Sequence, residues 1–201
     1  DITVHNGDAI DGKGKKSGAT EIIESDRNEQ VRMASSFLGA IDTKELRLTY
    51  GTGYHTGNDE DYEDNLAQVL GCPPPKAVLD LEVNGVILNF KHKVGGSQIP
   101  HGRLTAQLRD KLWNDIWAQR GEYPRSDVQF RSHNHYFAYG GNYESLVIAT
   151  PALQGYGSKF GQRIMSGTVD FGFIHVDIDR QGRLSWEPHI LRMPFQPAEN
   201  I

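Results

Sequence analysis

The chain has 201 residues, 37% of them hydrophobic, and a formal net charge of −5 at pH 7. This length and composition predict a single domain over residues 1–201 and exclude a disordered chain. The negative charge, without a long basic face, excludes a protein that binds nucleic acid only by neutralising phosphates. No apolar run approaches the roughly 18 residues of a transmembrane helix, and no secretory segment opens the chain. We therefore expect a cytoplasmic protein that has no membrane partner.

The first part of the chain predicts short strands that alternate with helices. Ile2 and Val4 predict a strand that ends at Asn6-Gly7-Asp8. A helix is expected from about Asp26 to Ala40, capped by Ser25 or Asp26, with one buried apolar stripe. A strand over residues 45–51 follows, then a loop over 51–57, and then a helix over 58–71 whose first turns are acidic, as the helix dipole favours.

The middle of the chain predicts a hairpin and a long helix. Two strands within residues 75–96 are joined at Asn84-Gly85, because both residues tolerate the positive φ of a tight turn. A helix is then expected from about Gly102 to Arg120. Its leucine and isoleucine residues recur at every fourth position, so we expect them in the core, with the two tryptophans packing beside them. This stripe comprises Leu104, Leu108, Leu112 and Ile116.

The last part predicts strands over residues 127–133, 145–151, 168–179 and 183–191, the last two joined by a turn at 179–182. There is no internal repeat and no interdomain linker. The order of elements indicates an α/β fold in which mixed β-sheets are covered by helices.

Polar side chains of metal-binding type follow four of these strands. Asp8 follows the first strand, His55 lies in the glycine-rich loop after the second, and His92 ends a later one. His133 and His135 end the strand over 127–133 and would point to the same side if the strand continued that far. Because sites in open sheets form outside strand ends, this pattern predicts one shared site.

The order of these residues resembles that of the calcineurin-like metallophosphoesterases. The resemblance spans Gly7 to His135 and rests on Gly7-Asp8-Ala9-Ile10-Asp11, Gly53-Tyr54-His55, a lone His92, and Ser132-His133-Asn134-His135. The phrases "GTGYHTG" and "RSHNHYF" are similar to those of phage-type members. The resemblance implies a four-layer αββα sandwich.

The resemblance also implies a site for two divalent ions that hydrolyses phosphate esters. Asp8 would bridge both ions, His92 and His133 would ligate one, and His135 would ligate the other. His55 would lie near the leaving-group oxygen. Two ions clamp a phosphate and convert bound water to hydroxide. Imidazole and carboxylate ligands suit Mn, Fe, Zn or Ni, and Mg also serves in such two-ion sites.

The sequence departs from the family pattern at three places. No Asp-x-His precedes Gly7, Tyr54 occupies the position of a metal-binding Asn, and Ser132 replaces a glycine. Because the chain opens on a strand without an initiator Met, we expect the missing motif upstream in a longer parent chain. This expectation makes the domain an N-terminally truncated one. At the second ion, Thr52 or a water would replace the Asn ligand. A single ion held by Asp8, His92 and His133 stays open as an alternative.

Other interpretations remain beside the hydrolase. A non-catalytic or single-metal remnant could act as an interaction or assembly module. Residues 7–14 match a phosphate-binding loop except at Gly14, where Ser or Thr is needed. Cys72 precedes prolines and is interpreted as structural. The histidines outside the pattern are also interpreted as structural, and His101 is in addition a candidate substrate contact. These histidines are His5, His101, His175 and His189.

The substrate is expected to be a phosphate ester or a nucleic acid. Loops over 13–19 and 95–101 would shape a cleft, and cations near the expected edge would attract a phosphate. These cations are Lys13, Lys15, Lys16, Lys91, Lys93 and Arg103. The oligomeric state does not follow from the sequence.

Overall fold

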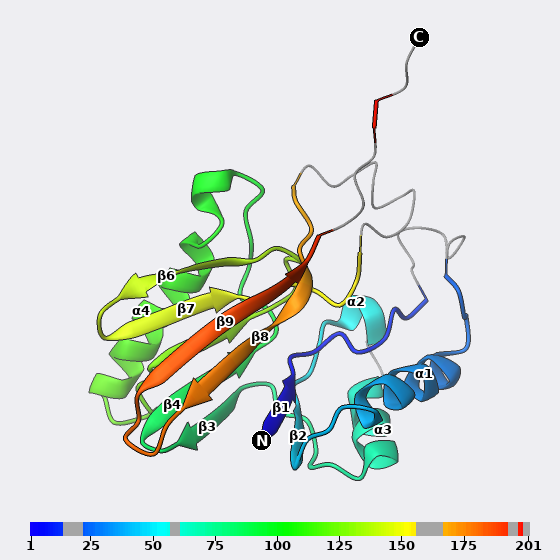
Figure 1. The fold of residues 1–201 in the computed structure, drawn as a ribbon, viewed down its shortest axis with the longest axis horizontal. Helices are drawn as coiled ribbons and strands as arrows, with labels where there is room; N and C mark the ends of the chain where they lie inside the picture. The colour runs from blue at the N-terminus through cyan, green and yellow to red at the C-terminus, as the bar shows by residue number, and fades with distance from the viewer. Residues whose placement is uncertain (14–21, 57–60, 156–166, 193–196, 199–201) are drawn as a thin grey trace.

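The computed structural model describes residues 1–13, 22–56, 61–155, 167–192 and 197–198 (Figure 1). The helices are α1 (Arg27–Gly39), α2 (Gly53–Thr56), α3 (Tyr62–Leu70) and α4 (Thr105–Gln119), with a 3-10 turn at Pro100–Gly102. The strands are β1 (Ile2–His5), β2 (Glu45–Leu48), β3 (Leu79–Val83), β4 (Val86–Lys91), β5 (Val128–Arg131), β6 (Ala138–Asn142), β7 (Ser145–Ala149), β8 (Phe171–Ile178) and β9 (Leu184–Leu191).

The N-terminal part is a parallel strand pair, β1 and β2, with α1 and α3 packed beside it. Helix α1 begins as expected, because the Asp26 side chain accepts a hydrogen bond from the backbone N–H of Asn28. Helix α3 ends at Gly71, whose φ of 65° closes the last turn in the left-handed conformation. The apolar faces of both helices, including Val31 and Leu66, form one core cluster with Leu48 of β2.

The central sheet has five strands in the order β3-β4-β5-β7-β6. Strands β3 and β4 form the expected hairpin, and Asn84 and Gly85 both have positive φ in its turn. Strand β5 runs parallel to β4 on one side and to β7 on the other. The sheet is therefore mixed, and the ends of β4 and β5 meet at one edge.

Alternation along β5 divides the central sheet into an apolar and a polar face. Val128 and Phe130 pack with Trp186 of the antiparallel β8–β9 ribbon, which covers this face. Gln129 and Arg131 point to the other face, where α4 lies (Figure 1). The expected fold class, α/β with a central mixed sheet, is confirmed.

The prediction that the apolar stripe of α4 lies in the core is wrong. Leu108 and Leu112 are 41% and 59% exposed, and Trp113 and Trp117 are 55% and 40% exposed. The buried residues of α4 are Gln107 and Lys111. The physical reason is the polar surface beneath the helix, which is matched by hydrogen bonds and ion pairs from the polar side of α4.

Three smaller differences concern the elements themselves. Strand β6 was not predicted, and the loop over 51–57 contains the short helix α2. Strand β5 ends at Arg131, so His133 and His135 follow the strand instead of extending it.

No helix among the described residues is long and apolar enough to cross a membrane.

Candidate metal centre

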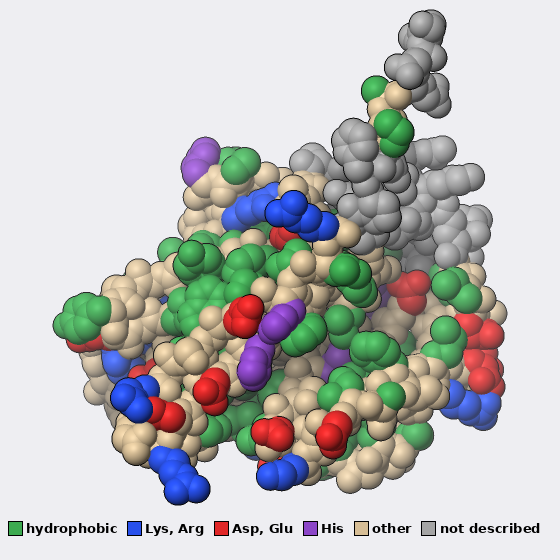
Figure 2. Space-filling model, viewed as in Figure 1, with side chains coloured by type: hydrophobic (Ala, Val, Ile, Leu, Met, Phe, Trp, Pro, Cys, Tyr) green, Lys and Arg blue, Asp and Glu red, His purple; other side chains and the backbone are tan. Residues whose placement is uncertain are grey.

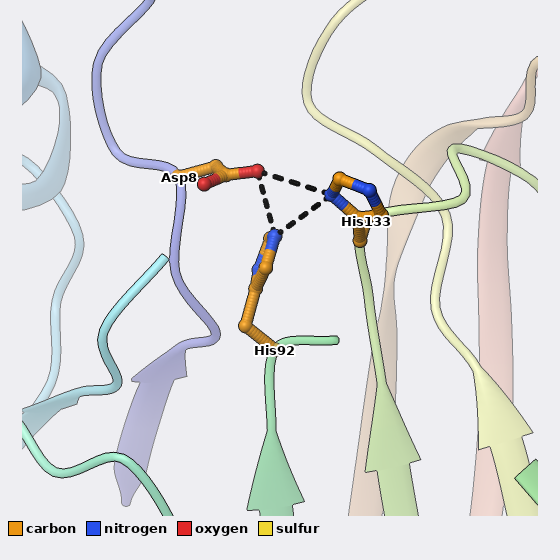
Figure 3. Close-up of side chains that lie close together, drawn as sticks. All are labelled: Asp8, His92 and His133. Atoms are coloured by element: carbon orange, nitrogen blue, oxygen red, sulfur yellow. Dashed lines mark hydrogen bonds and ion pairs between the residues drawn. The ribbon is translucent and has the colours of Figure 1, made fainter. Parts of the chain in front are cut away.

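Three predicted site residues converge where β1, β4 and β5 end (Figure 3). Nε2 of His92 lies 2.6 Å from Oδ2 of Asp8, and Nδ1 of His133 lies 3.5 Å from the same oxygen. The two imidazole nitrogens are 3.3 Å apart. Each residue thus offers one donor atom, and all three atoms lie within 4.8 Å of one another. This is the size of a shell around a single cation.

Backbone carbonyls fix the orientation of two imidazoles. Nδ1 of His92 donates to the carbonyl oxygen of Asn6 at 2.6 Å, and Nδ1 of His55 donates to that of Asp11 at 3.0 Å. A carbonyl can only accept, so the hydrogen is on Nδ1 in both rings. The Nε2 atoms then face Asp8, with His55 at 3.6 Å. Such bonds hold metal-binding histidines in one tautomer.

The two oxygens of the Asp8 carboxylate have different surroundings. Oδ1 accepts hydrogen bonds from the backbone N–H and the hydroxyl of Thr52, at 2.6 and 3.1 Å. Oδ2 is buried, faces the imidazoles, and has no hydrogen bond of good geometry. A buried oxygen without a partner among nitrogen donors fits a cation, because the cation would satisfy it.

The same surroundings keep Asp8 ionised. Burial alone would raise the pKa of its carboxyl, but interactions with His133 and His92 outweigh burial. Electrostatic interactions with His92 and His55 act in the same direction. The pKa of Asp8 is therefore held well below its usual range, which keeps the oxygen available as a ligand.

Backbone conformation at the candidate ligands is strained. The φ angles of Asp8, His133 and His135 are 54°, 72° and 58°, in the left-handed region that side chains rarely adopt. Each such residue costs roughly 1–2 kcal/mol. Strain of this kind persists where the surrounding structure holds it, and it concentrates at functional sites.

Two polar residues from the helices hold the Asp8 loop. Gln30 of α1 accepts from the backbone N–H of Gly12 at 2.7 Å and donates to its carbonyl at 3.0 Å. Glu63 of α3, which is fully buried, accepts from the N–H of Ala9 at 3.4 Å. Burial raises the pKa of Glu63, and the nearby charge of Asp8 adds to this effect. The loop that carries Asp8 is thus fixed by hydrogen bonds from both helices.

The His133 turn is fixed by its middle residue. Asn134 donates from Nδ2 to the carbonyl of Gly95 at 2.9 Å. A Cβ on Gly96 would lie 2.0 Å from Oδ1 of Asn134, so any other residue there would displace the Asn134 side chain. The loop after β4 and the turn after β5 are therefore packed together beside the site.

His135 and Tyr54 lie at the margin of the cluster. Among the described residues, the group with metal-binding spacing does not include His135. Burial lowers the pKa of His135, and the charge of His133 lowers it further. The ring of Tyr54 contacts that of His55 edge to face, with centroids 4.8 Å apart. A second ion held by Asp8 and His135 stays a prediction.

Sequence reasoning missed Asn6, which connects three of the strand ends. Its Nδ2 donates to Oγ of Ser132 at 2.8 Å, and its Oδ1 accepts from the hydroxyl of Thr49 at 2.8 Å. Its carbonyl accepts from His92. The one signal in the sequence is its place directly before Gly7-Asp8, where the first predicted strand ends.

The remaining histidines and Cys72 lie outside the cluster. His175 and His189 are exposed on the outer face of β8–β9, which carries histidine and acidic side chains in Figure 2. His101 is exposed on the 3-10 turn. Cys72 packs against the α1–α3 core, and burial raises the pKa of its thiol.

Two of the cationic side chains that were expected to attract a phosphate interact with other residues. Nζ of Lys91 lies 3.7 Å from Asp110, and Arg103 stacks on Tyr136 and donates to the hydroxyl of Thr168 at 3.0 Å. Lys15 and Lys16 lie outside the described residues. A phosphate-binding cleft built from these cations stays a prediction.

The donor set suits a divalent metal ion. One carboxylate oxygen and two imidazole nitrogens lie within reach of a single position. Imidazole favours Zn, Cu, Fe or Ni, and carboxylate also accepts Mn and Mg, so the ligand types do not select one metal. The residues present fit an ion at Asp8, His92 and His133.

No protein-family model matches the sequence, and no curated protein matches it. Among solved structures, Vps29 from Chaetomium thermophilum is similar at 9% identity and a TM-score of 0.47, covering 94% of this chain and 79% of that chain. A novel archaeal phosphodiesterase is similar at 12% identity and a TM-score of 0.46, covering 83% and 94%. Vps29 from Entamoeba histolytica complexed with Zn²⁺ is similar at 13% identity and a TM-score of 0.40, covering 78% and 88%. At these identities and TM-scores the similarities assign neither a family nor a function to the chain.

Proposed function

We propose that the protein is a metal-dependent phosphoesterase. The observation that carries the proposal is the buried Oδ2 of Asp8, which has Nε2 of His92, Nδ1 of His133 and Nε2 of His55 within 3.6 Å. The order of the surrounding motifs along the chain, which resembles metallophosphoesterases, supports phosphate ester hydrolysis in particular.

The residues have distinct parts in the proposed reaction. A bound divalent ion supplies Lewis acidity toward a phosphoryl oxygen and an acidified water. Asp8, His92 and His133 hold the ion, and Thr52 holds Asp8 through the second carboxylate oxygen. His55 does not need to be a ligand. In the imidazolium form of His55, the hydrogen on Nδ1 is bonded to the carbonyl of Asp11, and Nε2 would donate the second hydrogen to the leaving-group oxygen.

The proposed substrate class is a phosphodiester, with a nucleic acid as one possible form. Hydrolysis of bis-p-nitrophenyl phosphate, p-nitrophenyl phosphate and a short DNA duplex under the same conditions separates diester, monoester and nuclease activity. A preference for the first over the second by at least about tenfold in kcat/KM supports the diester, a difference of about 1.4 kcal/mol in transition-state binding.

The test combines metal content with turnover. After loading with Mn²⁺, bound metal per chain is measured by elemental analysis, and bis-p-nitrophenyl phosphate hydrolysis is followed in parallel. His133→Ala should lose both the ion and the turnover, whereas His175→Ala, on the exposed face of β8, should keep both. Turnover that is unchanged in His133→Ala would contradict the proposal.

One observation favours a second candidate, a single-ion module without turnover. Only Oδ2 of Asp8 is directed at the imidazoles, since Oδ1 is bonded to Thr52. A protein of this kind would bind one ion and remain inactive on all three substrates. Two ions per chain together with turnover would exclude it, and one ion with no turnover would establish it against the hydrolase.

A further inference from the structure

The three residues of the candidate metal centre come from two separate sheets. Asp8 follows β1 of the two-stranded sheet, whereas His92 and His133 follow β4 and β5 of the central sheet (Figure 3). Among the described residues, no backbone-to-backbone hydrogen bond joins the β1–β2 pair to the central sheet. The distance between Asp8 and the two histidines therefore depends on contacts made by side chains.

A chain of four polar side chains crosses from one sheet to the other. The hydroxyl of Thr49 donates to Oδ1 of Asn6 at 2.8 Å, and Nδ2 of Asn6 donates to Oγ of Ser132 at 2.8 Å. Oγ of Ser132 lies 2.7 Å from Oγ1 of Thr150. Because Ser132 accepts from Asn6, its own hydrogen can be donated to Thr150.

Each member of this chain directly follows a strand. Thr49, Asn6, Ser132 and Thr150 are the first residues after β2, β1, β5 and β7. The chain therefore joins the ends of two strands of the β1–β2 pair to the ends of two strands of the central sheet. Thr49 is fully buried, so the hydrogen bond that it donates is protected from water.

The bond between Asn6 and Ser132 lies beside the candidate metal centre. Asn6 is two residues before Asp8, and Ser132 directly precedes His133. Oδ2 of Asp8 and Nδ1 of His133 face each other at 3.5 Å without a bond of good geometry. The Asn6–Ser132 bond thus holds the two chain segments whose side chains must meet at an ion.

The Ser132 hydroxyl is the best acceptor that Nδ2 of Asn6 has. The carbonyls of Lys91 and Phe130 lie 3.4 and 3.5 Å from the same nitrogen, beyond the usual length of an N–H···O bond. The glycine that the family pattern has in place of Ser132 offers no hydroxyl. In this chain the hydroxyl therefore makes a link between the sheets that a glycine could not make.

We propose that Ser132 is a positioning residue of the metal centre, and that its hydroxyl sets the distance between Asp8 and His133 through Asn6. His92 keeps its own bond to the carbonyl of Asn6, so loss of the hydroxyl acts on His133. Residues that orient ligands contribute roughly 10–100-fold to metal affinity. This inference rests on the metal centre of the proposed function and does not depend on phosphate ester hydrolysis.

Binding of Mn²⁺, measured by competition with a fluorescent chelator, tests the role of the hydroxyl. Ser132→Ala should raise the Kd at least about tenfold. Ser132→Thr, which restores a hydroxyl, should bind within about threefold of the wild type. Ser145→Ala is the matched control, because it removes a hydroxyl at the opposite end of β7 that accompanies Asn142. It should leave the Kd unchanged.

The urea midpoint of each variant without metal separates positioning from folding. A Ser132→Ala protein with a lower midpoint but a Kd within about threefold of the wild type overturns the proposal, because the hydroxyl would then act on stability alone. So does a Ser132→Thr protein that binds as weakly as Ser132→Ala.

Thr150→Val tests whether the effect belongs to the Asn6–Ser132 bond. It removes the hydroxyl next to Ser132 and leaves the bond from Asn6 in place, so the Kd should stay within about threefold of the wild type. A loss as large as that of Ser132→Ala would overturn the assignment to this bond. Binding is measured without substrate, so a wild type that binds Mn²⁺ but hydrolyses no phosphate ester would contradict the phosphoesterase and not the role of Ser132.

Discussion

Thr52 donates two hydrogen bonds to one oxygen of Asp8, from its backbone N–H at 2.6 Å and from its hydroxyl at 3.1 Å. The other oxygen is left for the imidazoles. Asp8 is therefore oriented by Thr52 and not by the histidines alone, which gives Thr52 the part of a positioning residue at the proposed metal centre.

Thr52→Val keeps the shape of the side chain and removes the hydroxyl bond. Because residues that orient a ligand contribute roughly 10–100-fold to metal affinity, we expect about tenfold weaker binding of Mn²⁺. Thr52→Ser retains the hydroxyl and should bind within about threefold of the wild type. Competition with a fluorescent chelator measures both affinities. Equal affinity of Thr52→Val and the wild type would show that the hydroxyl does not position Asp8.

Gly12 and Gly71 both have positive φ but differ in their surroundings. A Cβ on Gly12 would lie 1.8 Å from the carbonyl oxygen of His55, whereas one on Gly71 would meet nothing within 4 Å. Gly71→Ala should cost about 1–2 kcal/mol of unfolding free energy from backbone strain alone. Gly12→Ala should cost at least about 3 kcal/mol, because strain and steric displacement add. Urea denaturation measures both, and similar losses in the two variants would contradict the expectation.

His5 makes the fold sensitive to acid. Burial, aided by the charge of His92 and opposed by Asp8, lowers its pKa from 6.5 to about 4, and its Nδ1 has no hydrogen bond. Between these values the unfolded chain binds a proton that the folded chain does not, so stability falls as the pH drops, by up to about 3 kcal/mol.

The corresponding test follows the urea midpoint between pH 7 and pH 4. His5→Gln should lose less stability over this range than the wild type, while His175→Gln, on an exposed strand face, should follow the wild type. A wild-type pH dependence in His5→Gln would mean that other groups carry the effect.

The ion pair beneath α4 should be far stronger than those at the surface. Asp110→Ala leaves the buried Arg131 guanidinium without its carboxylate, which costs about 3–5 kcal/mol. Arg125→Ala removes an exposed pair with Asp115 and Glu144 and should cost less than about 1 kcal/mol. Thermal and urea unfolding of the two variants provide the comparison. A small loss in Asp110→Ala would mean that Asn89 alone satisfies Arg131.

Much of the fold follows from local signals. The Asp26 cap, the Asn84-Gly85 turn and the turn at 179–182 are each determined by residues within a few positions, so the sequence predicts them correctly. The convergence of Asp8, His92 and His133 also follows, because each comes directly after a predicted strand. Whether these residues bind metal stays a prediction.

The errors concern contacts between distant residues. The periodicity of α4 is real, but which side is buried depends on Gln129 and Arg131 of β5, and the helix pattern alone does not contain that information. Likewise, His133 and His135 share a strand-like spacing, yet both adopt positive φ in a turn fixed by Gly95. The polar connections of Asn6 to β4 and β5 are invisible in the same way.

The register between β4 and β5 determines both the packing of the core and the position of the metal-binding residues. Insertions and deletions in β5 would therefore affect both. Lys91 pairs with Arg131 in the register, so His92 and the turn carrying His133 leave the sheet side by side. Removing one residue from β5 would turn Phe130 toward α4 and Arg131 toward β8–β9, and would also displace His133 from Asp8. Insertions and deletions within β5 should therefore destabilise the fold and also disrupt the proposed metal centre. Those in the exposed turn after β8 should be tolerated.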